Sequence, residues 1–334
     1  MKIAIIGAGW VGCHLAKTLM PADLTLFDER GIFEGTSFRN QNRLHLGFHY
    51  ARNYQTRRLC QTTFNRFVNE YSNLVKAIDS NVYAVPNHFS NIDFRTYLSI
   101  FDYEGIEYSG VNCESLVDIE GSIKNSEMLI DYREAREYFT RLHSQKLSIK
   151  RIDSSNILDL LLQYDFVINC TNNAIKEDLI QAYHELSLTL LYRKTNQIEF
   201  DALTLVDGNF FSLFPYRDDL YTLTSVKHTP IYISNNPEAV IEQEDSLSKK
   251  DIEPLQTSFA GEVLAYYPDF LRNFEYESFF TSIKAKTINS SANRYPIVKF
   301  HDRLINCFTG KIQGIFMIEE SIKKYINEYE GFNR

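Results

Sequence analysis

The stretch that decides the fold runs from Lys2 to Leu19 and reads KIAIIGAGWVGCHLAKTL. Its apolar run, Ile3 to Ile6, is typical of a central parallel strand that is covered on both faces. Gly7, Gly9 and Gly12 follow with the spacing G-x-G-x-x-G. Apolar residues then recur at helical spacing, at Val11, Leu15 and Leu19. The sequence therefore predicts a strand, a glycine turn and a helix at the start of an α/β fold.

The spacing of the three glycines has a chemical reason. Gly7 permits the tight turn, Gly9 lets a pyrophosphate approach the backbone, and Gly12 lets the helix pack closely on the strand. The helix N-terminus, at Trp10 and Val11, offers free N–H groups and a positive dipole end to that pyrophosphate. We therefore expect these five residues to bind a dinucleotide.

A second strand, DLTLFDER, supplies the context that this motif requires. It ends at Asp28, about 20 residues after the first glycine, where an acid accepts hydrogen bonds from the adenosine ribose. Glu29 and Arg30 directly follow Asp28, and we expect them to contact the nucleotide as well. An acid at this position argues against a 2'-phosphate, and it leaves NAD and FAD as alternatives. A glycine-rich turn without any nucleotide is the competing interpretation.

Composition narrows the class of protein. A length of 334 residues favours two core-forming units, and a net charge of -8 with a pI near 5.6 gives no basic surface for nucleic acid. No apolar stretch approaches the roughly 20 residues of a transmembrane helix. The five cysteines are widely spaced and form no CxxC, so we expect neither disulfides nor a metal site, and a cytoplasmic location.

A polar segment follows the second strand where another amphipathic helix would be usual. Residues 39 to 50, RNQNRLHLGFHY, contain two arginines, three amide side chains and two histidines. Leu44, Leu46 and Phe48 alternate with polar residues, which predicts a half-buried strand whose polar face lines a pocket.

At this segment the chain resembles the D-amino-acid oxidase type of FAD-dependent oxidoreductase, which includes glycine oxidase, sarcosine oxidase and L-2-hydroxyglutarate dehydrogenase. The likeness to the hydroxyglutarate enzyme is carried by Ser37, Asn40, Leu44, His45, Gly47, Phe48, Tyr50, Leu59 and Cys60. The chain departs from that pattern at Asn42, Arg43 and His49. The resemblance implies FAD as the cofactor and does not identify the substrate.

The resemblance also implies which residues contact FAD. In this family the polar loop follows the pyrophosphate and the ribityl chain, which implicates Ser37, Arg39, Asn40 and Gln41. Thr171 and Asn172 follow a buried strand, at a turn where the family carries glycine at the position of Asn172. The last loop before the C-terminal helix, which contains Gly310, Lys311 and Ile312, is expected at the pyrimidine end of the flavin.

The implied fold is a Rossmann-like FAD-binding domain with a parallel sheet, joined to a substrate domain with an antiparallel sheet. The FAD-binding domain is expected at 1–80, 130–185 and 290–334, and the substrate domain at 81–129 and 186–289. We also predict helices at 59–78, 133–142, 251–264 and 270–276, and strands with irregular segments from 81 to 130.

Four residues of the polar segment are candidate catalytic residues. His45 or His49 suits a proton acceptor because the reference pKa of histidine lies near neutrality. Arg43 suits bidentate contact with an anion, and Tyr50 lies beside them. Candidate substrate contacts from the antiparallel region are Tyr216, Arg217 and His228.

These residues support oxidation of a small molecule, with hydride transfer to flavin N5 from a carbon that carries a hydroxyl or an amine. The substrate is left open between a hydroxy acid, a sugar derivative and an amino acid, and the electron acceptor between oxygen, a quinone and another carrier. Similar polar loops occur in family members associated with bacterial surface-polysaccharide genes, which favours a sugar derivative. The alternatives are an amino-acid or amine oxidase and a nucleotide-binding protein without catalysis.

Overall fold

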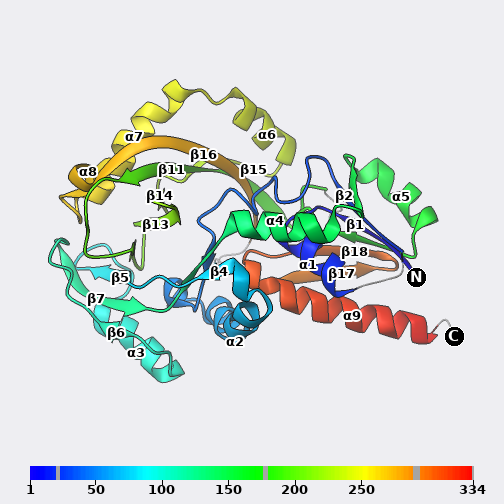
Figure 1. The fold of residues 1–334 in the computed structure, drawn as a ribbon, viewed down its shortest axis with the longest axis horizontal. Helices are drawn as coiled ribbons and strands as arrows, with labels where there is room; N and C mark the ends of the chain where they lie inside the picture. The colour runs from blue at the N-terminus through cyan, green and yellow to red at the C-terminus, as the bar shows by residue number, and fades with distance from the viewer. Residues whose placement is uncertain (20–22, 176–179, 289–293, 333–334) are drawn as a thin grey trace.

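The computed structural model describes residues 1–19, 23–175, 180–288 and 294–332. Figure 1 shows the N-terminal strand inside one sheet and the long strands β11 and β16 arching over a second region of the molecule. The helices are α1 (Trp10–Thr18), α2 (Tyr54–Glu70), α3 (Phe94–Glu104), α4 (Tyr132–His143), α5 (Ser154–Gln163), α6 (Pro237–Ser246), α7 (Lys249–Leu264), α8 (Phe270–Asn273) and α9 (Ile315–Phe332). Short 3-10 turns span Phe48–Tyr50, Ser72–Leu74 and Ile312–Gly314.

The first sheet contains six strands in the order β17-β18-β10-β1-β2-β9, and only β17 runs antiparallel to its neighbour. Its strands are β1 (Lys2–Ile6), β2 (Asp23–Asp28), β9 (Leu147–Ile149), β10 (Phe166–Asn169), β17 (Ile297–His301) and β18 (Leu304–Phe308). Helices α1, α4 and α9 cover one face with a common apolar core, and α5 covers the other. The expected buried central strand is therefore confirmed, with β1 between β2 and β10.

The second sheet has nine strands, with the order β15-β11-β14-β13-β12-β5-β7-β6 and β16 paired to β11. All pairs are antiparallel except β5 with β12. Its strands are β5 (Asn81–Pro86), β6 (Ser109–Gly110), β7 (Ile119–Asn125), β11 (Ala182–Lys194), β12 (Ala202–Leu205), β13 (Phe211–Arg217), β14 (Leu220–Ser225), β15 (Pro230–Ser234) and β16 (Phe274–Thr287). A parallel sheet together with a largely antiparallel one confirms the expected fold class.

The two faces of the second sheet bury different side chains. Leu203, Leu205 and Leu213 pack with α7 on the outer face, where α6 and α7 lie in Figure 1. The alternate residues of the same strands, including Thr204 and Ser212, point to the opposite face. A third, three-stranded sheet joins β3 (Arg43–Leu44), β8 (Met128–Ile130) and β4 (Val75–Lys76), and it lies at this inner side.

The glycine motif adopts the geometry that its spacing requires. Gly7 has a φ of +100°, and a Cβ at this position would lie 2.8 Å from the carbonyl oxygen of Cys170. A Cβ on Gly12 would lie 1.9 Å from the carbonyl oxygen of Gly7, so the helix packs against the turn only without a side chain there. Asn172 has a φ of +55°, the left-handed conformation that asparagine tolerates better than most residues.

Several predicted elements are wrong in extent or type. The helix expected at 59–78 is α2, which ends at Glu70 before a 3-10 turn and β4. The helix expected at 270–276 is only α8, because β16 begins at Phe274. The region from 81 to 130 contains a helix, α3, that the prediction missed although Asp93 caps its start and Gly105 ends it with a φ of +66°.

The prediction of a strand through Leu44, Leu46 and Phe48 is also wrong. Strand β3 has only two residues, and Gly47, with a φ of +114°, turns the chain into a 3-10 turn. The helix expected at 133–142 is confirmed as α4, with Asp131 accepting hydrogen bonds from two backbone N–H groups at its start.

Candidate active site

The glycine turn and the first turn of α1 form an open cradle of backbone N–H groups. No side chain caps α1 at Gly9, so the N–H groups of Val11 and Gly12 remain available to an anion. A Cβ on Gly9 would lie 2.7 Å from Ser37 Oγ, which shows how closely the polar loop approaches the turn. Ser37 Oγ accepts from the Trp10 N–H at 3.0 Å. This cradle fits a pyrophosphate between two loops.

Only the backbone of Trp10 contributes to the cradle of N–H groups. Its indole packs in the core against Phe33, Phe67 and Phe139, so its side chain makes no contribution to the cradle. Asp28 already accepts three backbone hydrogen bonds, from Ala8 at one oxygen and from the two residues Arg30 and Gly31 at the other. Asp28 thus fixes the glycine turn as well as carrying a charge at the expected ribose position. Exposed Glu29 and Arg30 pair with each other at 3.4 Å.

Several hydrogen bonds of the polar loop connect residues within the loop itself. Asn40 donates to the Thr36 carbonyl and accepts from the Asn42 N–H. Gln41 reaches the second sheet and donates to Thr222 Oγ1 at 3.1 Å. Arg39 is half-buried. The loop therefore joins the two sheets beside the cradle.

Two further segments reach the same edge of the first sheet. Thr171 Oγ1 donates to Asn169 and accepts from the Ile175 N–H, which stabilises the turn that contains Asn172. In the C-terminal loop, a Cβ on Gly310 would lie 2.7 Å from the side chain of Arg294. Ile312 starts the 3-10 turn that precedes α9.

Strand register places a row of hydroxyl groups on the inner face of the second sheet. Tyr83 of β5 lies opposite Thr204 of β12, and Thr204 lies opposite Ser212 of β13. Arg43 lies over this row: Nη1 donates to Tyr83 and Thr204 at 2.9 and 2.8 Å, and Nη2 donates to Ser212. Its guanidinium also stacks 4.0 Å from the ring centre of Phe214.

The hydrogen bonds of Arg43 leave only one edge of its guanidinium for the bidentate contact expected from the sequence. Thr204 and Ser212 are themselves hydrogen-bonded at 2.9 Å, so together they occupy the end-on pair of Nη1 and Nη2. Three of the five N–H groups of Arg43 are thereby used. Among the described residues none accepts from Nε, so the side-on edge, Nε–H with the second Nη2–H, is left for a ligand.

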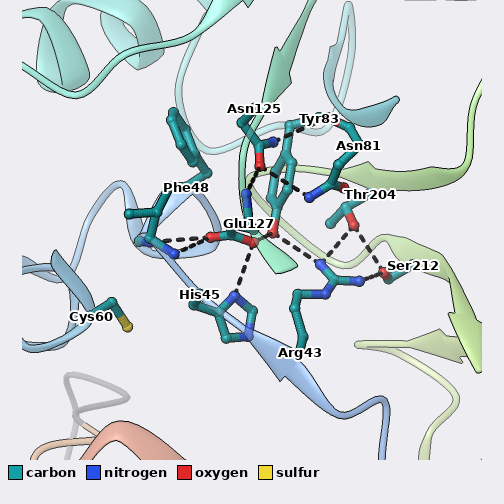
Figure 2. Close-up of polar contacts among 12 residues, drawn as sticks. Arg43, His45, Phe48, Cys60, Asn81, Tyr83, Asn125, Glu127, Thr204 and Ser212 are labelled. Atoms are coloured by element: carbon teal, nitrogen blue, oxygen red, sulfur yellow. Dashed lines mark hydrogen bonds and ion pairs between the residues drawn. The ribbon is translucent and has the colours of Figure 1, made fainter. Parts of the chain in front are cut away.

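A second register brings His45 to a buried carboxylate. Leu44 of β3 pairs with Met128 of β8, so the adjoining residues, His45 and Glu127, face each other. His45 Nδ1 lies 3.2 Å from Glu127 Oε2, as Figure 2 shows. Glu127 is fully buried and also accepts from Tyr83 Oη at 2.7 Å and from the Leu46 and Gly47 N–H groups at 2.8 and 3.1 Å.

Near pH 7 one member of this pair is neutral and the other is charged. Burial and the nearby positive charge of Lys311 lower the pKa of His45, so its imidazole is neutral near pH 7. This differs from the expectation of a value near neutrality, because water is excluded. Burial alone would raise the pKa of Glu127, but His45 and Arg43 together lower it, so the carboxylate is ionised.

Lys311 Nζ lies 4.7 Å from the ring centre of Tyr50. Burial, with the charges of Arg294 and Arg43, lowers its pKa to about 7. Burial lowers the pKa of His49, whose Nδ1 has no partner among the described residues. Gln313 donates to the carbonyl oxygens of His45 and Cys60 at 2.8 and 2.9 Å, which ties the C-terminal loop to the polar segment.

The structure thus brings together Arg43, His45, His49, Tyr50 and Lys311. It does not bring the three strand candidates to them. His228 packs against Phe259 of α7 at the outer face, with the rings tilted by 41°. Arg217 is exposed, and Tyr216 stacks on Tyr132 at 4.5 Å.

Sequence reasoning missed Glu127, Tyr83, Thr204 and Ser212. Glu127 had one available signal, as an isolated acid directly before the apolar residues of β8. The other three are ordinary strand residues, and only register reveals them. Among the described residues no three His, Cys, Asp or Glu side chains gather as a metal ion would require. No helix in the described part of the chain is both long and apolar enough to cross a bilayer.

Comparison with known proteins agrees with this geometry. No protein-family model matches the chain. A protein named FAD-dependent monooxygenase FPY4, from Fusarium mangiferae, is 31% identical over 343 residues, which cover 98% of this chain and 91% of the relative. Glycine oxidase from Geobacillus kaustophilus superposes with a TM-score of 0.70 at 11% identity, over 98% of this chain and 94% of the other.

The chain belongs to the FAD-dependent oxidoreductases, and it has the fold of the D-amino-acid oxidase type. L-α-glycerophosphate oxidase from Mycoplasma pneumoniae, whose structure contains FAD, has the same fold with a TM-score of 0.70 at 13% identity, over 98% and 94% of the two chains. The choice between NAD and FAD is therefore settled as FAD, and the oxidoreductase is an enzyme rather than a passive nucleotide-binding protein.

Proposed function

We propose that this FAD-dependent oxidoreductase oxidises a small anionic molecule at a carbon that carries a hydroxyl group, with His45 accepting the hydroxyl proton. One observation carries the proposal. His45 is a buried, neutral imidazole whose Nδ1 faces an ionised carboxylate, and no described residue is hydrogen-bonded to its Nε2. Such a group is suited to take a proton from an alcohol. A hydroxy acid or a sugar acid fits this chemistry.

The charge of the substrate follows from the cations around His45. Arg43 has only hydroxyl groups as hydrogen-bond partners, and Lys311 has no carboxylate within salt-bridge distance among the described residues. A carboxylate on the substrate would accept from the side-on edge of Arg43 and would offset both charges.

The cofactor would be held by the glycine cradle with Ser37, and by the loop of Gly310, Lys311 and Ile312. Bound FAD supplies the acceptor for the hydride, at N5 of the flavin. The protein's own residues orient the substrate at Arg43 and hold the proton at His45 Nε2. Loss of the proton from oxygen and of the hydride from carbon leaves a carbonyl product.

The test begins with the absorption band near 450 nm of the purified protein, with FAD added. Anaerobic mixing with hydroxy acids, sugar acids and amino acids should bleach this band with hydroxy compounds. His45→Gln should slow the bleaching by about 10²- to 10⁴-fold. His228→Gln is the matched control, because His228 lies on the outer face. Bleaching by amino acids alone, or an unaffected His45→Gln variant, would contradict the proposal.

A second candidate comes from the 31% identical relative, which is named a monooxygenase. Such a reaction would place an oxygen atom from O₂ into the substrate and would need an external reductant such as NADPH. Supplying ¹⁸O₂ distinguishes the two: label in the product supports monooxygenation, and unlabelled product supports dehydrogenation.

A further inference from the structure

We propose that Glu127 is a positioning residue that fixes the tautomer of His45, so that Nδ1 carries the hydrogen and Nε2 presents its lone pair to the substrate. This deepens the proposed function and rests on it only for the identity of His45 as the base. The site therefore contains a carboxylate–imidazole pair (Figure 2), in which the carboxylate is fully buried.

The hydrogen bonds of Glu127 determine the tautomer. An ionised carboxylate only accepts hydrogen bonds. Its Oε1 accepts from the N–H groups of Leu46 and Gly47, and its Oε2 accepts from Tyr83 Oη. The remaining neighbour of Oε2 is His45 Nδ1 at 3.2 Å, which must therefore donate. A neutral imidazole with hydrogen on Nδ1 has its lone pair on Nε2.

The orientation of the carboxylate is itself held by the surrounding strands. The Glu127 N–H donates to Asn125 Oδ1 at 3.0 Å, and Asn81 Nδ2 donates to the same oxygen at 3.0 Å. Tyr83 cannot rotate its hydroxyl away, because its oxygen also accepts from Arg43 Nη1. Six residues thus hold the carboxylate directly or through one neighbour: Leu46 and Gly47 of the turn, Asn81 and Tyr83 of β5, Asn125 of β7 and Arg43 of β3.

Glu127 also stabilises the imidazolium that forms when His45 accepts the proton of the substrate. The charged and titratable groups near His45 are Arg43 of β3, His49 and Tyr50 of the 3-10 turn, Lys311 of the C-terminal loop, and Glu127. Cys60 of α2 lies near Lys311 and Glu127 of the same group. The arginine and the lysine oppose an imidazolium, and Glu127 at 3.2 Å favours it. When the O–H bond of the substrate breaks and the Nε2–H bond forms, the new charge lies beside this carboxylate.

The decisive measurement is ¹⁵N NMR of histidine side chains in the FAD-loaded protein without substrate. The signals of His45 are assigned from the His45→Gln variant. In the wild-type protein we expect a protonated Nδ1 and an unprotonated Nε2. The opposite tautomer, or an imidazolium at pH 7, would overturn the proposal.

Glu127→Gln supplies the perturbation. The glutamine carbonyl keeps the two backbone N–H groups, so its NH₂ group faces His45 Nδ1 and forces the hydrogen onto Nε2. We expect the ¹⁵N pattern of His45 to invert. With a hydroxy compound that bleaches the wild-type flavin, kcat should fall by about 10²- to 10⁴-fold while KM changes by less than about threefold.

The chain offers a matched control. Glu319 pairs with His14 Nε2 at 3.1 Å, and His14 Nδ1 contacts Tyr71 Oη, in a buried cluster between α1, α2 and α9. Glu319→Gln should change the signals of His14 and leave those of His45 and kcat unchanged. An unchanged His45 pattern in Glu127→Gln would refute the positioning role. If the ¹⁵N pattern inverts in Glu127→Gln but the wild-type protein oxidises no hydroxy compound, the proposed function alone is refuted.

Discussion

Replacing Lys311 by methionine should stabilise the FAD-free protein, and the gain should depend on pH. Burial, with the positive charges of Arg294 and Arg43, lowers the pKa of Lys311 from 10.5 to about 7. The ammonium Nζ of Lys311 lies 4.7 Å from the ring centre of Tyr50, and methionine places an uncharged thioether in that region instead.

The sign follows from proton binding in the two states. Below pH 7 both the folded and the unfolded chain carry the protonated lysine, so the folded state bears the full cost of burying the charge. Between about pH 7 and 10.5 the folded lysine is neutral and the unfolded one is charged, so stability rises with pH and the cost declines. Methionine avoids the cost at every pH. The expected gain is therefore at most about 5 kcal/mol at pH 6 and about 2 kcal/mol at pH 9.

Urea unfolding of the FAD-free protein at pH 6 and pH 9, followed by circular dichroism, measures the difference. Lys324→Met on α9 is the control, because Lys324 is exposed and should give little change at either pH. A gain of equal size at both pH values would refute the reasoning, since it would show that the charge of Lys311 is not what burial disfavours. A loss of stability would show that Lys311 has a partner that the folded protein needs.

Two further results are expected. Gly12→Ala should abolish FAD binding, measured by the 450 nm band after loading, because its Cβ would lie 1.9 Å from the Gly7 carbonyl oxygen; Gly110→Ala, with open space around it, should bind FAD normally. Arg43→Lys should raise KM for an anionic substrate by about tenfold or more, because an ammonium group cannot both bond to Ser212 and present a side-on edge. An unchanged KM would exclude Arg43 from substrate binding.

The sequence by itself determined the start of the fold and a dinucleotide site, and the resemblance to a known family implied FAD. Gly7, Gly12 and Asn172 occupy positions where the backbone turns or packs too closely for other residues, and such local requirements are visible in consecutive letters. The same holds for the polar loop beside the cradle, since its side chains are neighbours in the chain. Apolar periodicity also located α4, whose cap Asp131 is adjacent to its first turn.

Only the tertiary structure decided the chemistry around His45. Glu127 is 82 positions away along the chain, and it meets His45 because β3 and β8 pair in one register out of several possible ones. The tertiary structure also decided which edge of Arg43 stays open to an anion, because Thr204 and Ser212 occupy the end-on edge. Local sequence restricts the backbone of each segment, whereas the partner of a side chain depends on how distant strands align, and alignment is set by the packing of the whole core.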